Sequence, residues 1–296
     1  MKYIDRKGNM TIEENDEDKL ARHLYTDRGG KLCMKALVRP WFSEVFSAVL
    51  KKGVSAYWIP GFVKRCGIDM SEYEEQKYHS FYDFFVRKIR PEERPLALGE
   101  KNLISPCDGR VSVHRIGHNS RFYIRETEYS LERLLRSENL SNRYKNGYAV
   151  VIRVSLEDYH RFCYPAAGVR SSEISIGGVY HASHTPAENT CPIYEENARK
   201  YCLLQTEKFG TVLMMELGRS YDHQKGPHRV KKGEEKGGFE FGAAVMLLLF
   251  QHGRVRLDYD LMENTENGFE TMVKMGEKIG EQKLPKRTGK ASSGIE

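Results

Sequence analysis

The longest hydrophobic segment of the chain is a run of eight apolar residues, 243–250. A charged, glycine-rich segment at 231–238 precedes this run, and the polar turn Gln251-His252-Gly253 follows it. A run of this length is too short to cross a bilayer, whereas it suits a strand that is buried on both faces. We therefore predict a central strand here, entered through a tight bend at Gly242.

Shorter alternating or apolar runs recur along the chain from residue 104 onward, and clusters of glycine, proline and asparagine separate them. This pattern is typical of a mostly β domain. The predicted strands cover residues 110–116, 149–154, 168–176, 211–217, 245–250 and 255–259. Between two of these strands, residues 130–140 predict one helix with Ser130 as its N-cap.

Helical spacing dominates the segment before this domain. From residue 31, apolar side chains recur three and four positions apart on either side of Pro40, which suits the first turn of a helix. Residues 79–96 predict a further helix, closed by Pro91 and Pro95. The fold class is therefore α+β, with an N-terminal helical subdomain followed by a β-rich domain.

These changes of pattern divide the chain into four segments. Residues 1–28 form a polar, acidic lead-in that we expect to be loosely ordered, and residues 29–96 form the helical region. The β-rich domain covers residues 97–280, and residues 281–296 form a polar tail that we expect to fray.

The charge of the helical region allows two interpretations. Residues 31–66 hold seven basic residues and one acid, Glu44, although the whole chain carries a net charge of only +6. Basic and aromatic residues interleaved on short helices suit docking at an anionic membrane, while a solvated basic face is the alternative. We predict membrane contact through Lys31, Lys35, Arg39, Trp41, Phe42 and Trp58. Nucleic-acid binding is disfavoured, because the chain has an acid-rich start and no recognition motif.

The composition of the chain indicates the cellular compartment in which the protein is found. Charged residues make up 30% of the chain and aromatic residues 11%, as in an ordinary soluble globular protein. No segment resembles a signal peptide or a membrane span, so we predict a cytoplasmic protein peripheral to the inner face of the membrane. The six cysteines are scattered without a C-x-x-C pair, which indicates free thiols and neither a disulfide framework nor a metal site.

Three short patterns contain residues suited to chemistry. Asp108 lies in the turn S-P-C-D-G, and His160 and Cys163 lie in D-Y-H-R-F-C after a predicted strand. The third pattern is the bend Gly242-Ala243-Ala244. Each is weak alone, because an aspartate in such a turn is more often an Asx cap and a lone histidine is more often structural. The three patterns taken together, in this order along the chain, are a more specific signal than any one of them.

Taken in order, these patterns resemble those of the phosphatidylserine decarboxylases, which are pyruvoyl enzymes that make phosphatidylethanolamine. The resemblance covers about residues 39–280. The matching elements are F-x-x-F-F-x-R with R-P (81–87 and 94–95), S-P-x-D-G (105–109), D-Y-H-R (158–161), E-N-x-R (196–199), F-G-x-V (209–212), K-G-E-E-x-G-x-F-x-F-G (232–242) and V-K-x-G-E-x-I-G (273–280). So many ordered matches indicate common descent.

The resemblance implies a self-made cofactor and a homodimer. In that family a serine after glycine attacks the preceding carbonyl, and elimination then cuts the chain and leaves a pyruvoyl group on the new N-terminus. That ketone forms a Schiff base with the amine of phosphatidylserine and accepts electrons while carbon dioxide leaves. The resemblance also implies that an aspartate, here Asp108, and the second histidine of D-Y-H-R-x-H activate the serine. It implies that a histidine of the same pattern acts in decarboxylation, which places His160 in the pocket.

This chain departs from the family pattern at the serine itself. The family's G-S-T reads Gly242-Ala243-Ala244-Val245 here, so Ala244 stands where the serine is expected. A methyl group has no oxygen with which to attack or eliminate. None of the 26 glycines is followed by serine or cysteine, so no substitute site exists. We therefore predict that the cofactor positions Gly242, Ala243 and Ala244 form no pyruvoyl group.

Two further departures accompany the first. Cys163 replaces the second histidine of D-Y-H-R-x-H, and a thiol is a poor general base near neutrality. Arg219 interrupts a strand that is apolar in the family. An engineered serine-to-alanine change would explain only Ala244, so we favour natural degeneration. Two functions remain open, an active decarboxylase acting on a membrane lipid and a non-catalytic homologue that binds anionic lipid or regulates a partner.

Overall fold

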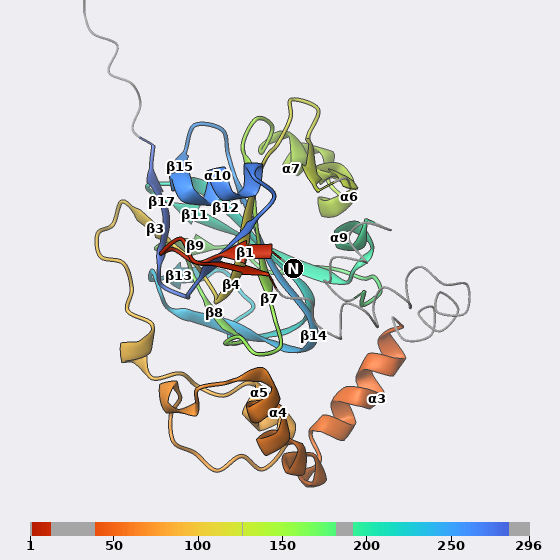
Figure 1. The fold of residues 1–296 in the computed structure, drawn as a ribbon. Coiled ribbons are helices and arrows are strands. Elements are labelled where there is room, and N and C mark those ends of the chain that lie inside the picture. The colour runs from red at the N-terminus through yellow and green to blue at the C-terminus, as the bar shows by residue number, and fades with distance from the viewer. Residues whose placement is uncertain (1, 13–38, 126, 182–191, 284–296) are drawn as a thin grey trace, which may run out of the picture.

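Strand β14 (Glu235–Phe250) runs through the largest sheet of the protein (Figure 1). The structure is a computed structural model that describes residues 2–12, 39–125, 127–181 and 192–283. Strand β14 pairs antiparallel with β12 (Gly210–Asp222) on one side and with β7 (Tyr148–Val154) on the other. Residues 244–250 are buried, and alternate side chains enter two different hydrophobic clusters. The prediction of a central strand buried on both faces is confirmed.

The strands of the large sheet follow an antiparallel path, in which β1 and β16 are the one parallel pair among the described strands. Their order is β13 (His228–Val230), β9 (Gly168–Arg170), β11 (Arg199–Thr206), β12, β14, β7, β4 (Gly109–Arg115), β16 (Glu270–Val273), β1 (Lys2–Ile4) and β2 (Met10–Ile12). Two short strands lie off this path, β8 (Arg161–Cys163) beside β14 and β10 (Ile174–Ile176) beside β11. The predicted strands are all present, with residues 168–176 divided between β9 and β10.

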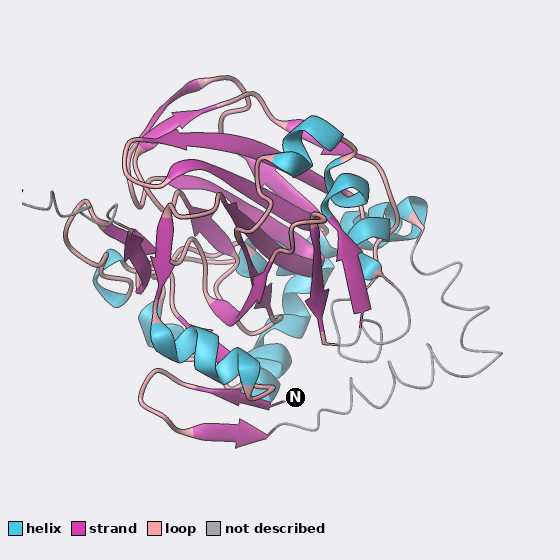
Figure 2. Cartoon of the chain, turned by 90° about the horizontal axis from the view of Figure 1, so that it is seen from above, coloured by secondary structure: helices cyan, strands magenta, loops and turns pink. Residues whose placement is uncertain are grey.

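Two smaller sheets and several short helices complete the β-rich part. One sheet contains β15 (Val255–Leu257), β17 (Lys278–Gln282) and β3 (Asn102–Ile104), and the other contains β5 (Arg121–Ile124) and β6 (Thr127–Ser130). The helices are α6 (Leu131–Leu135), α7 (Glu138–Asn142), α9 (Ile193–Glu196) and α10 (Tyr259–Glu266). In the view from above, helices lie around the strands (Figure 2). The described structure is therefore α+β and mostly β.

The single helix predicted over 130–140 is wrong, because the structure divides it into α6 and α7. Arg136 adopts a left-handed conformation with φ 50°, which ends the first helix. Ser137 then caps the second helix by accepting a hydrogen bond from the backbone N–H of Leu140.

The helical region lies together beside one end of the sheet (Figure 1). It contains α3 (Pro40–Leu50), α4 (Ile59–Cys66), α5 (Phe81–Phe85) and the 3-10 turns η1 (Gly53–Trp58), η2 (Met70–Glu72) and η3 (Pro91–Glu93). The helices α3, α4 and α5 share a small core of Leu50, Phe62, Phe81, Phe84 and Phe85. No helix within the described residues is long and apolar enough to cross a membrane.

The helix predicted over 79–96 is wrong in extent, because α5 ends at Phe85. The following segment is extended and pairs with residues near Tyr73, where the backbone N–H of Arg90 donates to the carbonyl of Glu72. These backbone hydrogen bonds replace the ones that a longer helix would have made.

Residues 2–12 of the lead-in differ from the expectation of loose order, and residues 13–28 lie outside the described residues. Residues 2–12 form the strands β1 and β2 at one edge of the large sheet, visible beside the N label in Figure 2. Tyr3 is buried there, and the Arg110 guanidinium lies 4.8 Å from the centre of its ring. A cation–π contact and the pairing with β16 therefore order this segment. Lys31 and Lys35 of the predicted membrane contacts lie outside the described residues.

Candidate functional site

Strand β14 is interrupted by a wide bulge at the position where the family pattern predicts chain cleavage. Gly218 and Ser220 of β12 pair with Ala244 and Phe239 of β14. On β12, Arg219 is the one residue between the two paired positions. On β14, the segment 240–243 lies between them. The backbone of Gly242 has φ 135°, which L side chains rarely adopt. The predicted bend is confirmed, and it re-aims the strand directly before Ala244.

Ala244 occupies a closed, apolar place after this bulge. Its side chain is fully buried in the main hydrophobic cluster, and its backbone pairs with Gly218 on one side and Val154 on the other. Gly242 is exposed, and the side chain of Ala243 lies outside the described part. No nucleophile is therefore present on the residue that stands at the serine position.

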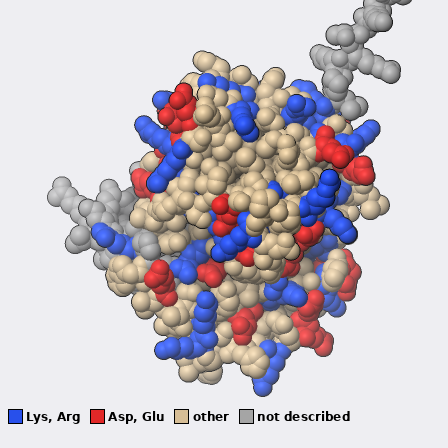
Figure 3. Space-filling view, turned by 180° about the vertical axis from the view of Figure 1, so that it is seen from behind, with Lys and Arg blue, Asp and Glu red and all other residues tan. Residues whose placement is uncertain are grey.

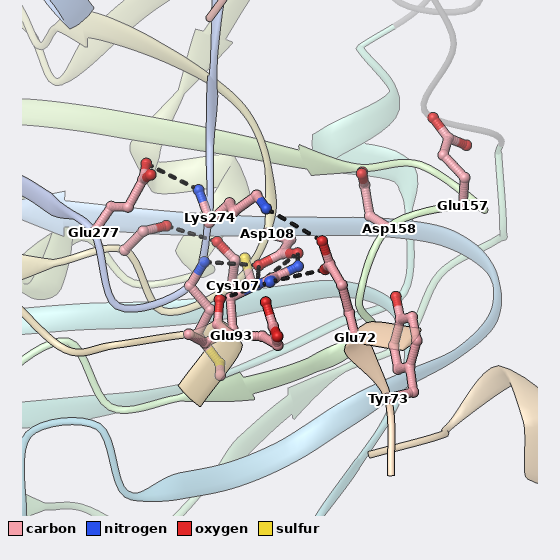
Figure 4. Close-up of polar contacts among 12 residues, drawn as sticks. Glu72, Tyr73, Glu93, Cys107, Asp108, Glu157, Asp158, Lys274 and Glu277 are labelled. Carbon is pink, nitrogen blue, oxygen red and sulfur yellow. Dashed lines mark hydrogen bonds and ion pairs between the residues drawn. The ribbon is translucent and has the colours of Figure 1, made fainter. Parts of the chain in front are cut away.

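Asp108 is held by an arginine rather than by a histidine (Figure 4). The guanidinium of Arg94 donates from Nε to Oδ1 at 2.9 Å and from Nη2 to Oδ2 at 2.6 Å. The backbone N–H of Met275 also donates to Oδ1 at 2.7 Å, and Arg94 contacts Glu72 at 3.1 Å. Such bidentate bonds hold the carboxylate in one orientation. Asp108 is therefore a buried carboxylate whose position is fixed.

The position of Asp108 relative to Ala244 follows from the strand order. Asp108 immediately precedes β4, and β7 lies between β4 and β14. Two strand spacings, about 10 Å, therefore separate these strands. Asp108 lines a cavity of about 240 Å³ together with Asp158 and residues of the helical region. Burial raises the pKa of Asp158 to about 7, against the charge of Arg110.

His160 lies in an apolar environment. Its side chain is 1% exposed, and its ring centre is 3.9 Å from the ring centre of Phe85. Within the described residues, neither ring nitrogen makes a hydrogen bond of normal geometry. Burial, assisted by the positive charge of Arg87, lowers the pKa of His160 to about 3, and the backbone of Asp158 offsets this only in part. The imidazole is therefore neutral near pH 7, and no hydrogen bond joins it to Asp108.

Cys163 lies beside the turn that carries Asp108. The backbone N–H of Cys163 donates to the carbonyl of Pro106 at 2.8 Å, which brings the D-Y-H-R-F-C and S-P-C-D-G patterns together. Burial raises the pKa of the Cys163 thiol to about 12. The thiol therefore remains protonated at physiological pH and cannot replace a histidine as a general base. Cys66, Cys107, Cys163 and Cys202 are free thiols in the described structure.

Sequence analysis missed an apolar cavity of about 640 Å³ between the helical region and β14. Its lining includes Phe46, Trp58, Phe62, Phe81 and Phe241. The aromatic spacing of the helical region was the available signal, but it did not indicate a cavity.

The structure describes the side chains of only some of the residues predicted to contact the membrane. Trp41, Trp58 and Arg39 are exposed, with exposed fractions of 56% for Trp41 and 48% for Trp58. The side chain of Phe42 lies outside the described part. On the face opposite to Figure 1, basic side chains are interspersed with acidic ones rather than gathered in one patch (Figure 3).

Comparisons with known proteins agree on one family. A family model described as phosphatidylserine decarboxylase matches residues 81–281. A phosphatidylserine decarboxylase proenzyme of Fusobacterium nucleatum is 35% identical over 294 residues, which covers 96% of this chain and 98% of that protein. Phosphatidylserine decarboxylase proenzyme 2 of Clostridium acetobutylicum is 35% identical and covers 88% of this chain and 91% of its own length. A proenzyme of Chlamydia felis is 34% identical and covers 95% and 97%.

The β-rich domain and its ordered motifs thus match a class of decarboxylases that are made as proenzymes. The chain belongs to the phosphatidylserine decarboxylase family. Members of this family use a pyruvoyl group derived from their own chain, and its formation requires a side-chain oxygen. The buried methyl group of Ala244 does not meet this requirement, so the residues present do not fit the group.

Proposed function

We propose that this protein is an uncut member of the family that binds phosphatidylserine or another anionic phospholipid without decarboxylating it. The observation that carries the proposal is Ala244, a residue without a nucleophile at the end of the β14 bulge. The state of Cys163 supports it, because a buried protonated thiol stands where the family pattern has a histidine. The reaction of the family, from phosphatidylserine to phosphatidylethanolamine and carbon dioxide, would then not start.

The helical region supports binding at a membrane, which we place at its inner face. The cavity between this region and β14 has a volume of about 640 Å³ and is lined mainly by aromatic and aliphatic side chains. Tyr57 and Trp58 stand at its rim with exposed fractions of 90% and 48%. Amphipathic aromatic side chains insert at the boundary between headgroups and acyl chains. Arg65 also lines the cavity and supplies a positive charge for anionic headgroups.

Intact mass spectrometry of the purified protein tests self-cleavage. We expect a single species of 34.2 kDa, because the chain lacks the oxygen that would cut it next to Gly242. The matched variant is Ala244→Ser, which restores only that oxygen. Two fragments from the unmodified chain, one of them carrying a ketone at its new N-terminus, would overturn the proposal. That result would favour the second candidate function, an active phosphatidylserine decarboxylase.

Co-sedimentation with vesicles tests lipid binding. We expect the protein to sediment with phosphatidylserine vesicles and much less with phosphatidylcholine vesicles, because anionic lipid attracts basic residues. The double variant Tyr57→Ser/Trp58→Ser should bind about tenfold more weakly, since full burial of a large apolar side chain is worth roughly 1.5–3 kcal/mol and these insert only in part. The control is Tyr259→Ser, which removes a 75% exposed aromatic on α10. Equal loss in the control would argue against a specific docking surface.

A further inference from the structure

A cavity of about 290 Å³ opens at the end of β4, on an edge that the neighbouring strand leaves uncovered. Strand β16 pairs with β4 only as far as Val111. Beyond that point no described strand pairs with this edge of β4, and the backbone N–H of Val113 donates instead to the hydroxyl of Thr265 on α10, at 3.0 Å. Helix α10 therefore takes the place of a strand beside the cavity.

Four of the side chains that line this cavity lie on one face of the sheet. Arg115 and Tyr148 are paired residues of β4 and β7, so their side chains leave the sheet on the same side. Met262 and Glu266 are one turn apart on α10, and Met262 packs with Tyr148 against the same hydrophobic cluster. Tyr123 of β5, which is 57% exposed, also lines the cavity. One occupant can therefore contact the four side chains at once.

Two of these four side chains, Arg115 and Glu266, are charged and unpaired. Within the described residues neither forms an ion pair or a hydrogen bond through its side chain, so they also lie too far apart to pair with each other. The guanidinium carbon of Arg115 lies 5.5 Å from the centre of the Tyr148 ring, which places the charge beside an aromatic surface. A positive and a negative group thus remain free at separate positions of one small cavity.

The composition of the cavity favours a small occupant that carries both charges. Burial lowers the pKa of His114, which also lines the cavity, to about 4, so its ring is neutral near pH 7. The charges of Arg115 and Glu266 then balance each other. The volume lies at the lower limit of the ~300–1,000 Å³ usual for ligand cavities, which suits one small molecule. The tyrosines and Met262 favour an apolar group on that molecule.

We propose that this cavity binds a free α-amino acid with an apolar side chain. The guanidinium of Arg115 binds the two carboxylate oxygens, since its planar donors match them in pairs. The carboxylate of Glu266 binds the ammonium group, and the apolar side chain lies against Tyr148 and Met262. A zwitterion is selected because only a molecule with both charges satisfies both groups.

The cavity is remote from the candidate site and from the helical region. On β7, Tyr148 pairs with Phe250, whereas Val154 pairs with Ala244. The offset from residue 148 to residue 154 in an extended strand corresponds to about 20 Å. In Figure 1, α10 and the helical region lie at opposite ends of the molecule. Amino-acid binding here goes beyond the proposed function and requires neither lipid binding nor an uncut chain.

Ligand-observed NMR titration of the full chain with L-phenylalanine tests the site. The matched probes are phenethylamine, which lacks the carboxylate, and 3-phenylpropionate, which lacks the ammonium group. We expect L-phenylalanine to bind in the millimolar range and each probe to bind about fivefold more weakly, the effect of one ion pair that is partly exposed to water. Equal affinity for L-phenylalanine and either probe would overturn the site, because one of the two charges would then contribute nothing.

Two variants assign each charge to its partner. Arg115→Gln should weaken the binding of L-phenylalanine about fivefold and leave that of phenethylamine unchanged, because phenethylamine has no carboxylate to lose. Glu266→Gln should weaken the binding of L-phenylalanine and leave that of 3-phenylpropionate unchanged. Both side chains are exposed, so neither substitution empties a buried position. The control is Arg229→Gln on β13, an exposed residue outside the cavity lining, which should change none of the three affinities.

Two further results would count against the site. One is the absence of saturable binding of L-phenylalanine up to its solubility limit. The other is an equal loss of all three ligands in Arg115→Gln or Glu266→Gln with a native circular dichroism spectrum, since the substituted side chain would then act through packing. If a variant fails to fold, the comparison of the three ligands on the unmodified chain decides the result. A cut chain in the mass spectrum would reject the proposed function and leave these affinities standing.

Discussion

Replacement of Lys236 by methionine is expected to destabilise the protein by about 3–5 kcal/mol, the usual cost of removing one partner of a buried ion pair. The Lys236 side chain is fully buried. Its Nζ lies 3.0 Å from Oε1 of Glu216 and 2.9 Å from Oδ2 of Asp222. Asp222 keeps a second cation, Arg170 at 2.8 Å, but Lys236 is the ion-pair partner of Glu216 in the described structure. The substitution therefore leaves Glu216 without a compensating charge.

Urea unfolding at pH 7 measures this effect, with two controls. The double variant Glu216→Leu/Lys236→Met should recover most of the lost stability, because replacing both buried ions by apolar groups is often neutral. The surface variant Lys231→Met should change the free energy of unfolding by no more than about 0.5 kcal/mol. If Lys236→Met and the double variant were equally unstable, packing rather than an uncompensated charge would be the cause. Burial already raises the pKa of Glu216, in spite of Lys236.

Acid should destabilise the protein through His160. The pKa of His160 is lowered from 6.5 to about 3 by burial and by Arg87. Between these values the unfolded chain binds a proton that the folded chain does not bind, so the free energy of unfolding falls as the pH falls. A full proton corresponds to about 1.4 kcal/mol per pH unit, which amounts to roughly 3 kcal/mol between pH 6.5 and pH 4.

The variant His160→Phe isolates this contribution, because its ring can pack against Phe85 without a titratable group. Urea unfolding of both proteins from pH 8 to pH 4 should show that the variant loses less stability than the unmodified chain. Other titrating groups, including His114, whose pKa is lowered to about 4 mainly by burial, contribute to both curves and cancel. Parallel curves for the two proteins would contradict the assignment. Retained stability of the variant at pH 8 would establish that the ring contact survives.

The strands were predictable because their side chains repeat with the period of a sheet. Residues 149–152 and 245–250 are continuous apolar runs, and both lie in neighbouring central strands. The strands at Lys2–Ile4 and Met10–Ile12 are too short to show a period, so they were missed. The helix over 79–96 was overextended because its apolar positions carry no information about the strand-like pairing near Tyr73.

The candidate site was predictable in its parts but not in its contacts. The motifs located Asp108, His160 and Ala244, because each lies in a short pattern with a fixed order. The bond between Arg94 and Asp108 joins distant positions, and no local spacing predicts it. The extent of the β14 bulge depends on the register against β12, which only the folded sheet defines. The sequence shows Arg219 as a charged residue in a strand that is apolar in the family, but only the structure shows its ion pair with Glu240.

The bulge in β14 also affects how the molecule can regain its structure after denaturation. In an uncut chain, as proposed above, the two halves of the strand Glu235–Phe250 belong to one polypeptide. After removal of denaturant these two halves should therefore pair again in a unimolecular step, whose rate does not depend on protein concentration. A relative severed at this point would have to reunite two chains, and its recovery would slow on dilution.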